Sequence, residues 1–506
     1  MSATSGPARA AAPFDLRAAA RAAVLDAGFV PDLDDAARAE LAAIEAGRPN
    51  PGGAPPFADL PVRDLRALPW SSVDDAASRD LDQVEVAEAL PDGRVRVRVG
   101  IADVDALVPR GSALDAHAAA NTTSVYTGLA TFPMLPEALS TDRTSLGADA
   151  DRAAVVVEFT VGPDGTTSDG DVYLARAVNR ARLAYESLGA WFDGRGPLPE
   201  AAARAPGMEA QLRLQEETAE RLRKQRVARG ALQLETVEAR PVVQGGAVTG
   251  LAVTPKSKAR DLIEDFMVAA NATVAERLEA AGLASIRRVV RIPERWDRIV
   301  QLARARGDAL PAAADPAALS AFLGRQRAAH PDQYAELSLA VVKLLGPGEY
   351  AVEQPGDRTL NHFGLAAQDY THGTAPNRRY ADLVTQRLVK YMLARRAGGS
   401  PSAPYSDDAL AAIARRCTER ENAARKVERL TRKQAAAALL AGRAGETFRA
   451  AVTGANPEGT YVRLADPPVE GRVVRGAAGL DVGDATRVRL VAVDPARGWV
   501  DFERAA

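Results

Sequence analysis

The chain has 506 residues, of which 66 are acidic and 64 basic, so its formal net charge is −2. A chain of this length exceeds what one hydrophobic core usually serves, which predicts two to four domains. Its single cysteine, Cys417, excludes an intramolecular disulfide and a zinc site built from paired cysteines, and only four histidines are present. Oxygen ligands would therefore have to hold any metal ion. No stretch of the sequence is apolar over the length of a membrane span, so a cytoplasmic protein without such a span is expected.

Two short helices are predicted near the start of the chain. The first runs from Asp15 through Ala27, and the second opens between Asp32 and Asp35, where acidic side chains suit a helix N-terminus. The Ala- and Arg-rich residues before them continue the composition of the whole chain, so a transit peptide is not expected. Pro and Gly in residues 47–56 predict a linker. Residues 1–59 are thus expected to form a helical N-terminal domain, either a helix-turn-helix module that holds nucleic acid or a packing appendage.

Residues 60–443 are expected to form one large domain of mixed sheet and helices. Strand-like runs occupy residues 94–101 and 153–161, whereas apolar spacing predicts helices over 262–278 and 380–392. A further helical pattern over 411–443 carries nine basic and three acidic residues, an excess of six positive charges. This run is either a solvated helix face or a wall that faces phosphates.

The last segment, residues 444–506, changes to short β runs separated by Gly and Asp. Five such runs in about sixty residues predict a small barrel of the OB type. The chain as a whole is therefore expected to be an α+β multidomain protein.

Three aspartates in the segment 72–83 carry the strongest chemical signal. Asp80 and Asp82 would share one face of an extended segment, because alternate side chains of a strand point the same way, and Asp74 precedes them by six residues. Converging carboxylates repel one another unless a cation lies between them, and hard oxygen ligands suit Mg²⁺. The alternative is an ordinary Asp-rich turn whose carboxylates cap backbone amides.

Further segments follow these aspartates in a fixed order. They are Ile101-Ala102-Asp103, Pro133-Met134-Leu135-Pro136, Leu262-Ile263-Glu264-Asp265-Phe266-Met267, His362-Phe363-Gly364-Leu365 and Pro376-Asn377-Arg378-Arg379-Tyr380-Ala381-Asp382-Leu383. Together with Asp74, Asp80 and Asp82, this series resembles the catalytic domain, often called RNB, of the ribonuclease II family.

The resemblance implies a processive 3′-to-5′ exoribonuclease that hydrolyses single-stranded RNA to nucleoside 5′-monophosphates. Asp74, Asp80 and Asp82 would then be catalytic ligands of one or two Mg²⁺ ions, with Mn²⁺ as an alternative, and Arg378 would contact the scissile phosphate. Arginine suits that contact because its planar fork matches phosphate oxygens. The alternative is that Arg378 and Arg379 are surface residues paired with acids.

The same resemblance implies a set of RNA-binding residues. Tyr126 would stack on bases near a channel, Tyr185 would pack against the 3′-terminal nucleotide, and Glu264 would accept from the terminal 2′-hydroxyl, which favours RNA over DNA. Glu428 would be a further contact to the 3′ end, and Arg379 would join the RNA-binding set. Each tyrosine could instead be an ordinary core side chain.

Two positions depart from the family pattern. Gln83 occupies the place of the fourth acid, and Leu234 occupies that of a stacking aromatic residue. The paired OB domains that usually precede the catalytic domain are not expected here, because residues 1–59 are too few for them and read as helical. Three hypotheses therefore stand: an active monomeric exoribonuclease, a catalytically weak or inactive RNA-binding protein of the same fold, and an unrelated phosphohydrolase of small nucleotides.

Overall fold

The computed structural model describes residues 14–53, 57–235, 239–244, 247–253, 256–357, 360–457 and 459–505. The first residues of the chain and the last part of the predicted linker, residues 54–56, lie outside these ranges. No helix in the described ranges is long and apolar enough to cross a membrane.

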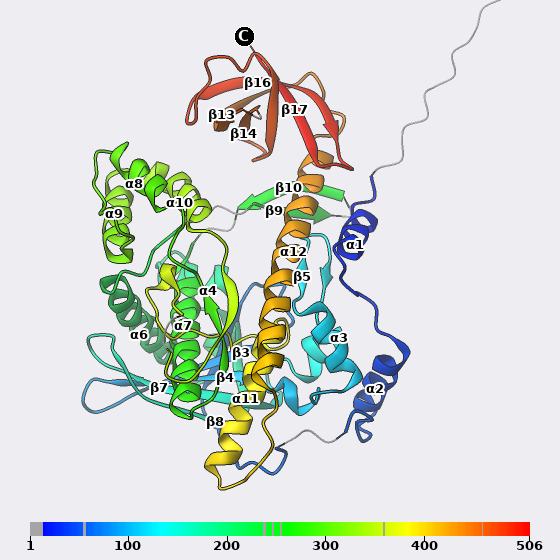
Figure 1. The fold of residues 1–506 in the computed structure, drawn as a ribbon, viewed down its shortest axis with the longest axis vertical. Helices are drawn as coiled ribbons and strands as arrows, with labels where there is room; N and C mark the ends of the chain where they lie inside the picture. The colour runs from blue at the N-terminus through cyan, green and yellow to red at the C-terminus, as the bar shows by residue number, and fades with distance from the viewer. Residues whose placement is uncertain are drawn as a thin grey trace, which may run out of the picture.

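The two predicted N-terminal helices are confirmed as α1 (Leu16–Asp26) and α2 (Asp35–Glu45). Each begins at an aspartate whose side chain accepts hydrogen bonds from the first turn, Asp15 for α1 and Asp34 for α2. Helix α1 lies beside the long helix α12 (Asp407–Leu440), and Val24 and Phe29 share an apolar cluster with Val427 (Figure 1). The N-terminal helices thus pack directly on the large domain.

A six-stranded sheet forms the base of the large domain. Its strands are β1 (Val62–Asp64), β2 (Trp70–Asp74), β3 (Gln83–Ala89), β4 (Val95–Ala102), β7 (Asp151–Val161) and β8 (Thr167–Ala184), in the order β1-β8-β2-β3-β4-β7. The long strand β8 pairs with β7 over its first part and with β2 at its end, so the sheet curls back on itself. Val95, Val97 and Val99 of β4 are buried on one face, as their alternation predicts.

Helices and short strands surround this sheet. They are η1 (Val104–Ala106), α3 (Ala113–Asn121), β5 (Val125–Tyr126), β6 (Thr131–Phe132), η2 (Leu139–Arg143), α4 (Tyr185–Phe192), α5 (Glu200–Arg204), α6 (Met208–Ala228), β9 (Ala239–Gln244), β10 (Ala247–Val253), α7 (Lys258–Ala280), β11 (Ser285–Val289), α8 (Trp296–Arg304), α9 (Pro316–Ala329), α10 (Pro331–Leu345), β12 (Glu349–Glu353), η3 (Phe363–Leu365) and α11 (Tyr380–Arg396). Strands β4 and β7 and helices α7, α11 and α12 confirm the five runs predicted for this domain.

Helices α8, α9 and α10 form a separate helical group between the paired strands β11 and β12. They lie together at the upper left of Figure 1 and bury an apolar cluster of their own, which includes Trp296, Phe322 and Leu337. This cluster is distinct from the main core that joins the sheet to α7 and α11.

The C-terminal segment is a closed five-stranded barrel, as predicted. Its strands are β13 (Thr447–Asn456), β14 (Gly459–Leu464), β15 (Glu470–Arg475), β16 (Ala485–Asp494) and β17 (Trp499–Arg504), in the order β13-β14-β15-β17-β16. The barrel lies at the end of α12, and Ala437 and Leu440 of that helix enter its apolar core (Figure 1). Gly498 is required at the turn before β17, because a Cβ there would lie 2.7 Å from Lys433 of α12.

Candidate active site

The three aspartates predicted as ligands lie at one end of the central sheet. Asp74 is the last residue of β2, and Asp80 and Asp82 belong to the loop that leads into β3. The Asp74 Oδ1 atom accepts hydrogen bonds from the Asp75 backbone N–H at 2.6 Å and from the Ser78 hydroxyl at 2.9 Å. The Asp82 side chain is buried, with 2% of its surface exposed.

The segment before α11 brings Arg378 to this end of the sheet. The backbone N–H of Asn377 donates to Asp82 Oδ1 at 3.0 Å, and Arg378 Nε lies 3.3 Å from Asp82 Oδ2. The second carboxylate oxygen, Oδ2, makes no hydrogen bond in the structure. The Arg378 side chain is 42% exposed, so it stays accessible to solvent while it pairs with a buried acid.

The buried Asp82 and the half-buried Asp74 are incompletely compensated. Burial raises the pKa of Asp82 to about 7, and the charge of Arg378 and the Asn377 hydrogen bond offset only part of that rise. Burial also raises the pKa of Asp74, against the bonds from Asp75 and Ser78 and the charge of Arg378. A site in which burial outweighs the available positive charge gains stability when a cation binds.

Tyr126, Asp80 and Glu428 come together from three elements. The Tyr126 hydroxyl donates to Asp80 Oδ2 at 3.3 Å, and the Tyr126 backbone N–H donates to Glu428 Oε1 at 3.2 Å. Tyr126 lies in β5 and Glu428 lies in α12, about 300 residues later in the chain. Because Tyr126 is 41% exposed, it is not a core side chain.

The ring of Tyr185 has a basic neighbour that the sequence did not reveal. Tyr185 is the first residue of α4, and the guanidinium carbon of Arg260 lies 4.2 Å from its ring centroid. Arg260 also makes an ion pair with Asp75. In the sequence, only the position of Arg260 two residues before the motif at Leu262 pointed to a role for this residue in the site.

The remaining two predicted RNA contacts differ in exposure. Glu264 of α7 has a side chain 58% exposed, and its Oε1 lies 3.6 Å from Arg226 Nη2. Arg379, in contrast, is 21% exposed and donates to Asp382 Oδ1 at 2.8 Å. The two neighbouring arginines therefore differ: Arg378 faces the aspartates and solvent, whereas Arg379 is engaged inside the protein.

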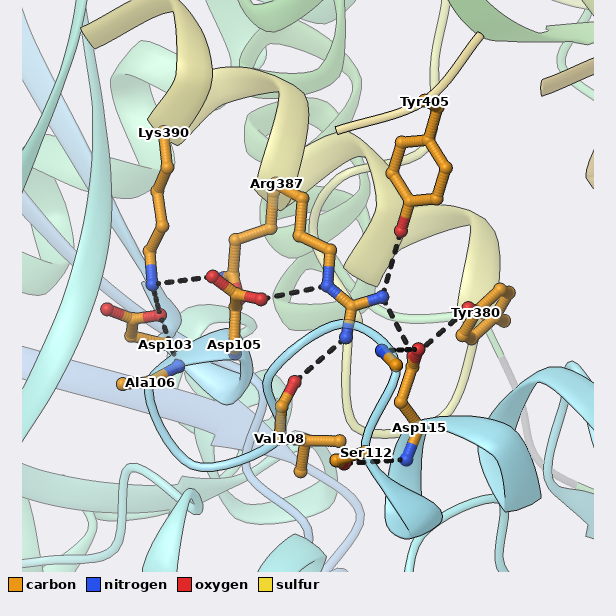
Figure 2. Close-up of polar contacts among 12 residues, drawn as sticks. Asp103, Asp105, Ala106, Val108, Ser112, Asp115, Tyr380, Arg387, Lys390 and Tyr405 are labelled. Atoms are coloured by element: carbon orange, nitrogen blue, oxygen red, sulfur yellow. Dashed lines mark hydrogen bonds and ion pairs between the residues drawn. The ribbon is translucent and has the colours of Figure 1, made fainter. Parts of the chain in front are cut away.

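A buried ion-pair network fastens α11 in place (Figure 2). The Arg387 guanidinium donates to Asp105 Oδ1 and Asp115 Oδ1, each at 2.8 Å. Lys390 Nζ lies 2.6 Å from Asp103 Oδ1 and 3.2 Å from Asp105 Oδ2. These acids follow β4 or lie in α3, so the network joins α11 to the sheet and holds the segment that carries Arg378.

The two departures from the family pattern occupy different environments. Gln83 begins β3 and is buried, with its backbone paired to Ile101. Leu234 packs against the apolar cluster of α8, α9 and α10. Two residues after Gln83, the fully buried Glu85 has two carboxylate oxygens that make no hydrogen bond to any described residue. Its place between Val84 and Val86 in a strand marks it in the sequence, because an acid among buried apolar positions is costly to bury unpaired.

The donors available for a metal ion are oxygen atoms of the aspartates. Among the described ranges, no three His, Cys, Asp or Glu side chains are grouped so that they could hold a metal ion. The chemistry of the donors nevertheless fits Mg²⁺, because Asp82 offers a buried oxygen without a hydrogen bond and Asp80 and Asp82 repel each other electrostatically.

The basic run of α12 divides into two parts. Arg416 donates to the Ala119 carbonyl oxygen of α3 at 3.0 Å, and Arg420 donates to that of Ala27, which follows α1, at 3.0 Å. The two arginines thus fasten α3 and α1 to α12. The other exposed cations of the run are Arg415, Arg425, Lys426, Arg429 and Lys433. The two predicted roles of the basic run, a solvated helix face or a wall that faces phosphates, therefore apply only to these exposed cations.

Comparison with known proteins places these features in a family. Residues 62–395 match the RNB domain, and residues 446–505 match the RNase II-type exonuclease C-terminal S1 domain. The chain is 30% identical to Ribonuclease R of Thermotoga maritima over 469 residues, which cover 87% of this chain and 64% of that protein. It thus spans less than two thirds of the length of this relative.

Two solved structures share the fold. Mycoplasma genitalium RNase R, in complex with ribose methylated single-stranded RNA, superimposes with a TM-score of 0.83 at 22% identity, over 97% of this chain and 78% of that one. Yeast Ssd1, described as a pseudonuclease, superimposes with a TM-score of 0.67 at 16% identity, over 90% of this chain and 55% of that one. The fold therefore occurs in a nuclease and in a pseudonuclease, and the side chains of the site must decide between them.

Proposed function

This chain belongs to the RNB family, and on that premise we propose that it is a 3′-to-5′ exoribonuclease that hydrolyses single-stranded RNA processively to nucleoside 5′-monophosphates. The observation that carries the proposal is the pairing of a solvent-facing Arg378 with a buried, incompletely compensated Asp82. In such a site the Arg378 guanidinium can bind a phosphate, and the adjacent Asp82 carboxylate can bind a metal ion.

Asp74, Asp80 and Asp82 would hold the metal, one or two ions of Mg²⁺ or Mn²⁺. When bound, the metal would activate water and stabilise the negative charge on the leaving 3′ oxygen. Gln83 adds no charge to this set, so the three aspartates and Arg378 would carry the electrostatic balance.

Arg378 would bind the scissile phosphate through its exposed guanidinium nitrogens. It lies just before α11, a helix of 17 residues whose N-terminus adds positive potential at the same place. The network around Arg387 supports this role, because it fixes the helix that follows Arg378. Substrate phosphate would therefore meet a guanidinium already oriented by Asp82.

The exposed Tyr126 ring would stack on a base, and its hydrogen bond to Asp80 would couple base binding to the aspartate loop. Glu428 would position Tyr126 through its backbone, and the exposed Glu264 would reach a ribose hydroxyl. Tyr185 would meet the terminal nucleotide with the face opposite Arg260. The pair of Arg379 with Asp382 favours a supporting role behind the RNA-binding surface.

We propose the same division of the chain as the sequence predicts: a helical N-terminal domain over 1–59, the catalytic domain over 60–443 and the RNA-binding barrel over 444–506. Trp499 of the barrel is 57% exposed, which suits stacking on single-stranded RNA. A cytoplasmic monomer is part of the proposal, and the buried thiol of Cys417 fits a reducing compartment.

The test is degradation of a single-stranded RNA labelled at its 5′ end, in the presence of Mg²⁺. An exoribonuclease of this polarity shortens the label stepwise to a small 5′ fragment, and Asp82→Asn abolishes shortening while RNA binding persists. Full cleavage by Asp82→Asn would remove the metal-site assignment. RNA that is bound but not shortened by the unmodified protein would favour the inactive RNA-binding alternative, and RNA neither bound nor shortened would favour a phosphohydrolase of small nucleotides.

A further inference from the structure

A groove of about 600 Å³ runs between α8 and α10 in the separate helical group. Three aliphatic side chains, Leu302, Ala340 and Leu344, line it together with Gln301, Arg295 and Arg298. The group has its own apolar cluster and lies on the opposite side of Figure 1 from α1 and α3. The groove contains none of the residues assigned to the candidate active site.

The two arginines of the groove differ from Arg291 and Arg325 of the same region. Arg291 pairs with Glu349, and Arg325 pairs with Asp308. Arg295 and Arg298 make no ion pair within the part of the chain that the structure describes, and both are exposed. They lie at the start of α8, where the helix dipole makes a cation unfavourable, so helix stability does not account for them.

The lining of the groove favours a peptide over a nucleic acid. Single-stranded RNA is held by aromatic side chains on which bases stack, and no aromatic side chain lines this groove. An aliphatic floor between two helices suits the leucine-like face of a third helix, and arginines at its rim suit carboxylates on the edge of that face.

We propose that this groove docks an acidic amphipathic helix of a protein partner. The partner would place apolar side chains on Leu302 and Leu344, and glutamates or aspartates against Arg295 and Arg298. The inference does not rest on the proposed nuclease activity. It predicts instead that the protein can be tethered to another protein through a surface that leaves RNA degradation unchanged.

Fluorescence anisotropy with the full chain tests the proposal. The probe is a labelled synthetic helical peptide with leucines on one face and glutamates beside them, and the comparison peptides carry lysine for glutamate or serine for leucine. The acidic leucine peptide is expected to bind most tightly. The double variant Arg295→Glu/Arg298→Glu should weaken binding about ten-fold or more, since two charge-assisted contacts are lost.

The matched control is Arg304→Glu, which changes the same charge at an exposed position in the last turn of α8, outside the groove. It should leave peptide affinity unchanged, and all variants should degrade RNA at the unmodified rate. Leu302→Glu should also weaken binding; if that variant fails to fold, the arginine pair alone decides. Equal binding of the lysine peptide, or of the peptide by the arginine double variant, would overturn the proposal. Loss of RNA affinity in the double variant would overturn it in favour of an RNA contact.

Discussion

Two arginines, one in the middle of α11 and one just before it, meet aspartates from distant parts of the chain, yet their surroundings are built differently. Within α11, Arg387 is 1% exposed and donates to Asp105, Asp115 and a backbone carbonyl, all at 2.8 Å (Figure 2). Before α11, Arg378 is 42% exposed, and the Asp82 oxygen beside it makes no hydrogen bond within the described residues.

The difference separates stability from function. Around Arg387 and Lys390 the charges are paired and hydrogen-bonded, which is what permits ions to be buried at all. Burial lowers the pKa of Lys390, but Asp103 and Asp105 outweigh it and raise that pKa above its usual value. Around Asp82 burial dominates instead. The charges around Arg387 are balanced without a ligand. The charges around Asp82 and Arg378 are not, so this site can still bind a cation and a phosphate.

The largest effect on folding is expected in the balanced network around Arg387. Arg387→Met removes the charge but keeps apolar volume, and it leaves two buried aspartates without their main partner. The free energy of unfolding should fall by about 3–5 kcal/mol in urea denaturation. Arg395→Met, at an exposed position of the same helix, is the control and should change it by no more than about 0.5 kcal/mol. A loss below about 1 kcal/mol for Arg387→Met would contradict the distinction between the stabilising Arg387 network and the Arg378–Asp82 site.

At Arg378 the opposite is expected: a substitution should lower activity strongly and stability little. Arg378→Ala should lower the single-turnover rate of RNA hydrolysis about a hundred- to a thousand-fold, because a charge-stabilising donor is lost. Its free energy of unfolding should change by less than about 1 kcal/mol, because the side chain is 42% exposed and Asp82, whose pKa is about 7, can take up a proton when the guanidinium is lost. Arg378→Lys should recover only part of the rate, because an ammonium lacks the planar fork. An unchanged rate with a large loss of stability would assign Arg378 to the scaffold.

Glu85 sharpens the comparison, because it is fully buried and forms no ion pair with any residue that the structure describes. Burial raises the pKa of Glu85 well above its usual value of 4.5, with a smaller contribution from Asp74. The folded protein therefore keeps a proton that the unfolded chain releases above about pH 4.5, so this group makes stability fall as pH rises through that range. Glu85→Gln should be more stable than the unmodified protein by about 1–2 kcal/mol at pH 8, and the difference should shrink towards pH 4.5. A difference that does not vary with pH, measured by urea denaturation, would contradict this account.

The smallest effect concerns metal affinity. Because the pKa of Asp82 is raised to about 7, binding of Mg²⁺ below that pH must release a proton. The affinity should rise up to about ten-fold per pH unit below pH 7 and level off above it. Calorimetric titrations in two buffers with different ionisation enthalpies measure the released proton, and Asp82→Asn should abolish it. An affinity that is constant between pH 6 and pH 8 would show that Asp82 is not a ligand.

Local patterns determined much of this protein. The aspartates at 15 and 34 fixed the starts of α1 and α2, strand-like runs predicted β4 and β7, and the β runs after residue 444 predicted the closed barrel. These features depend on neighbours within a few residues, whose effects can be read along the chain. The order of the motifs also indicated the family without any contact being known.

Only the tertiary structure decided which charges are paired. Arg378 and Arg379 are adjacent and chemically identical, yet one meets Asp82 from another part of the chain and the other pairs inward with Asp382. The partners of Glu428, Arg260 and Arg387 likewise come from segments distant in sequence. Burial and long-range contacts set the electrostatic balance of a site, and neither is encoded in the spacing of residues along a single segment.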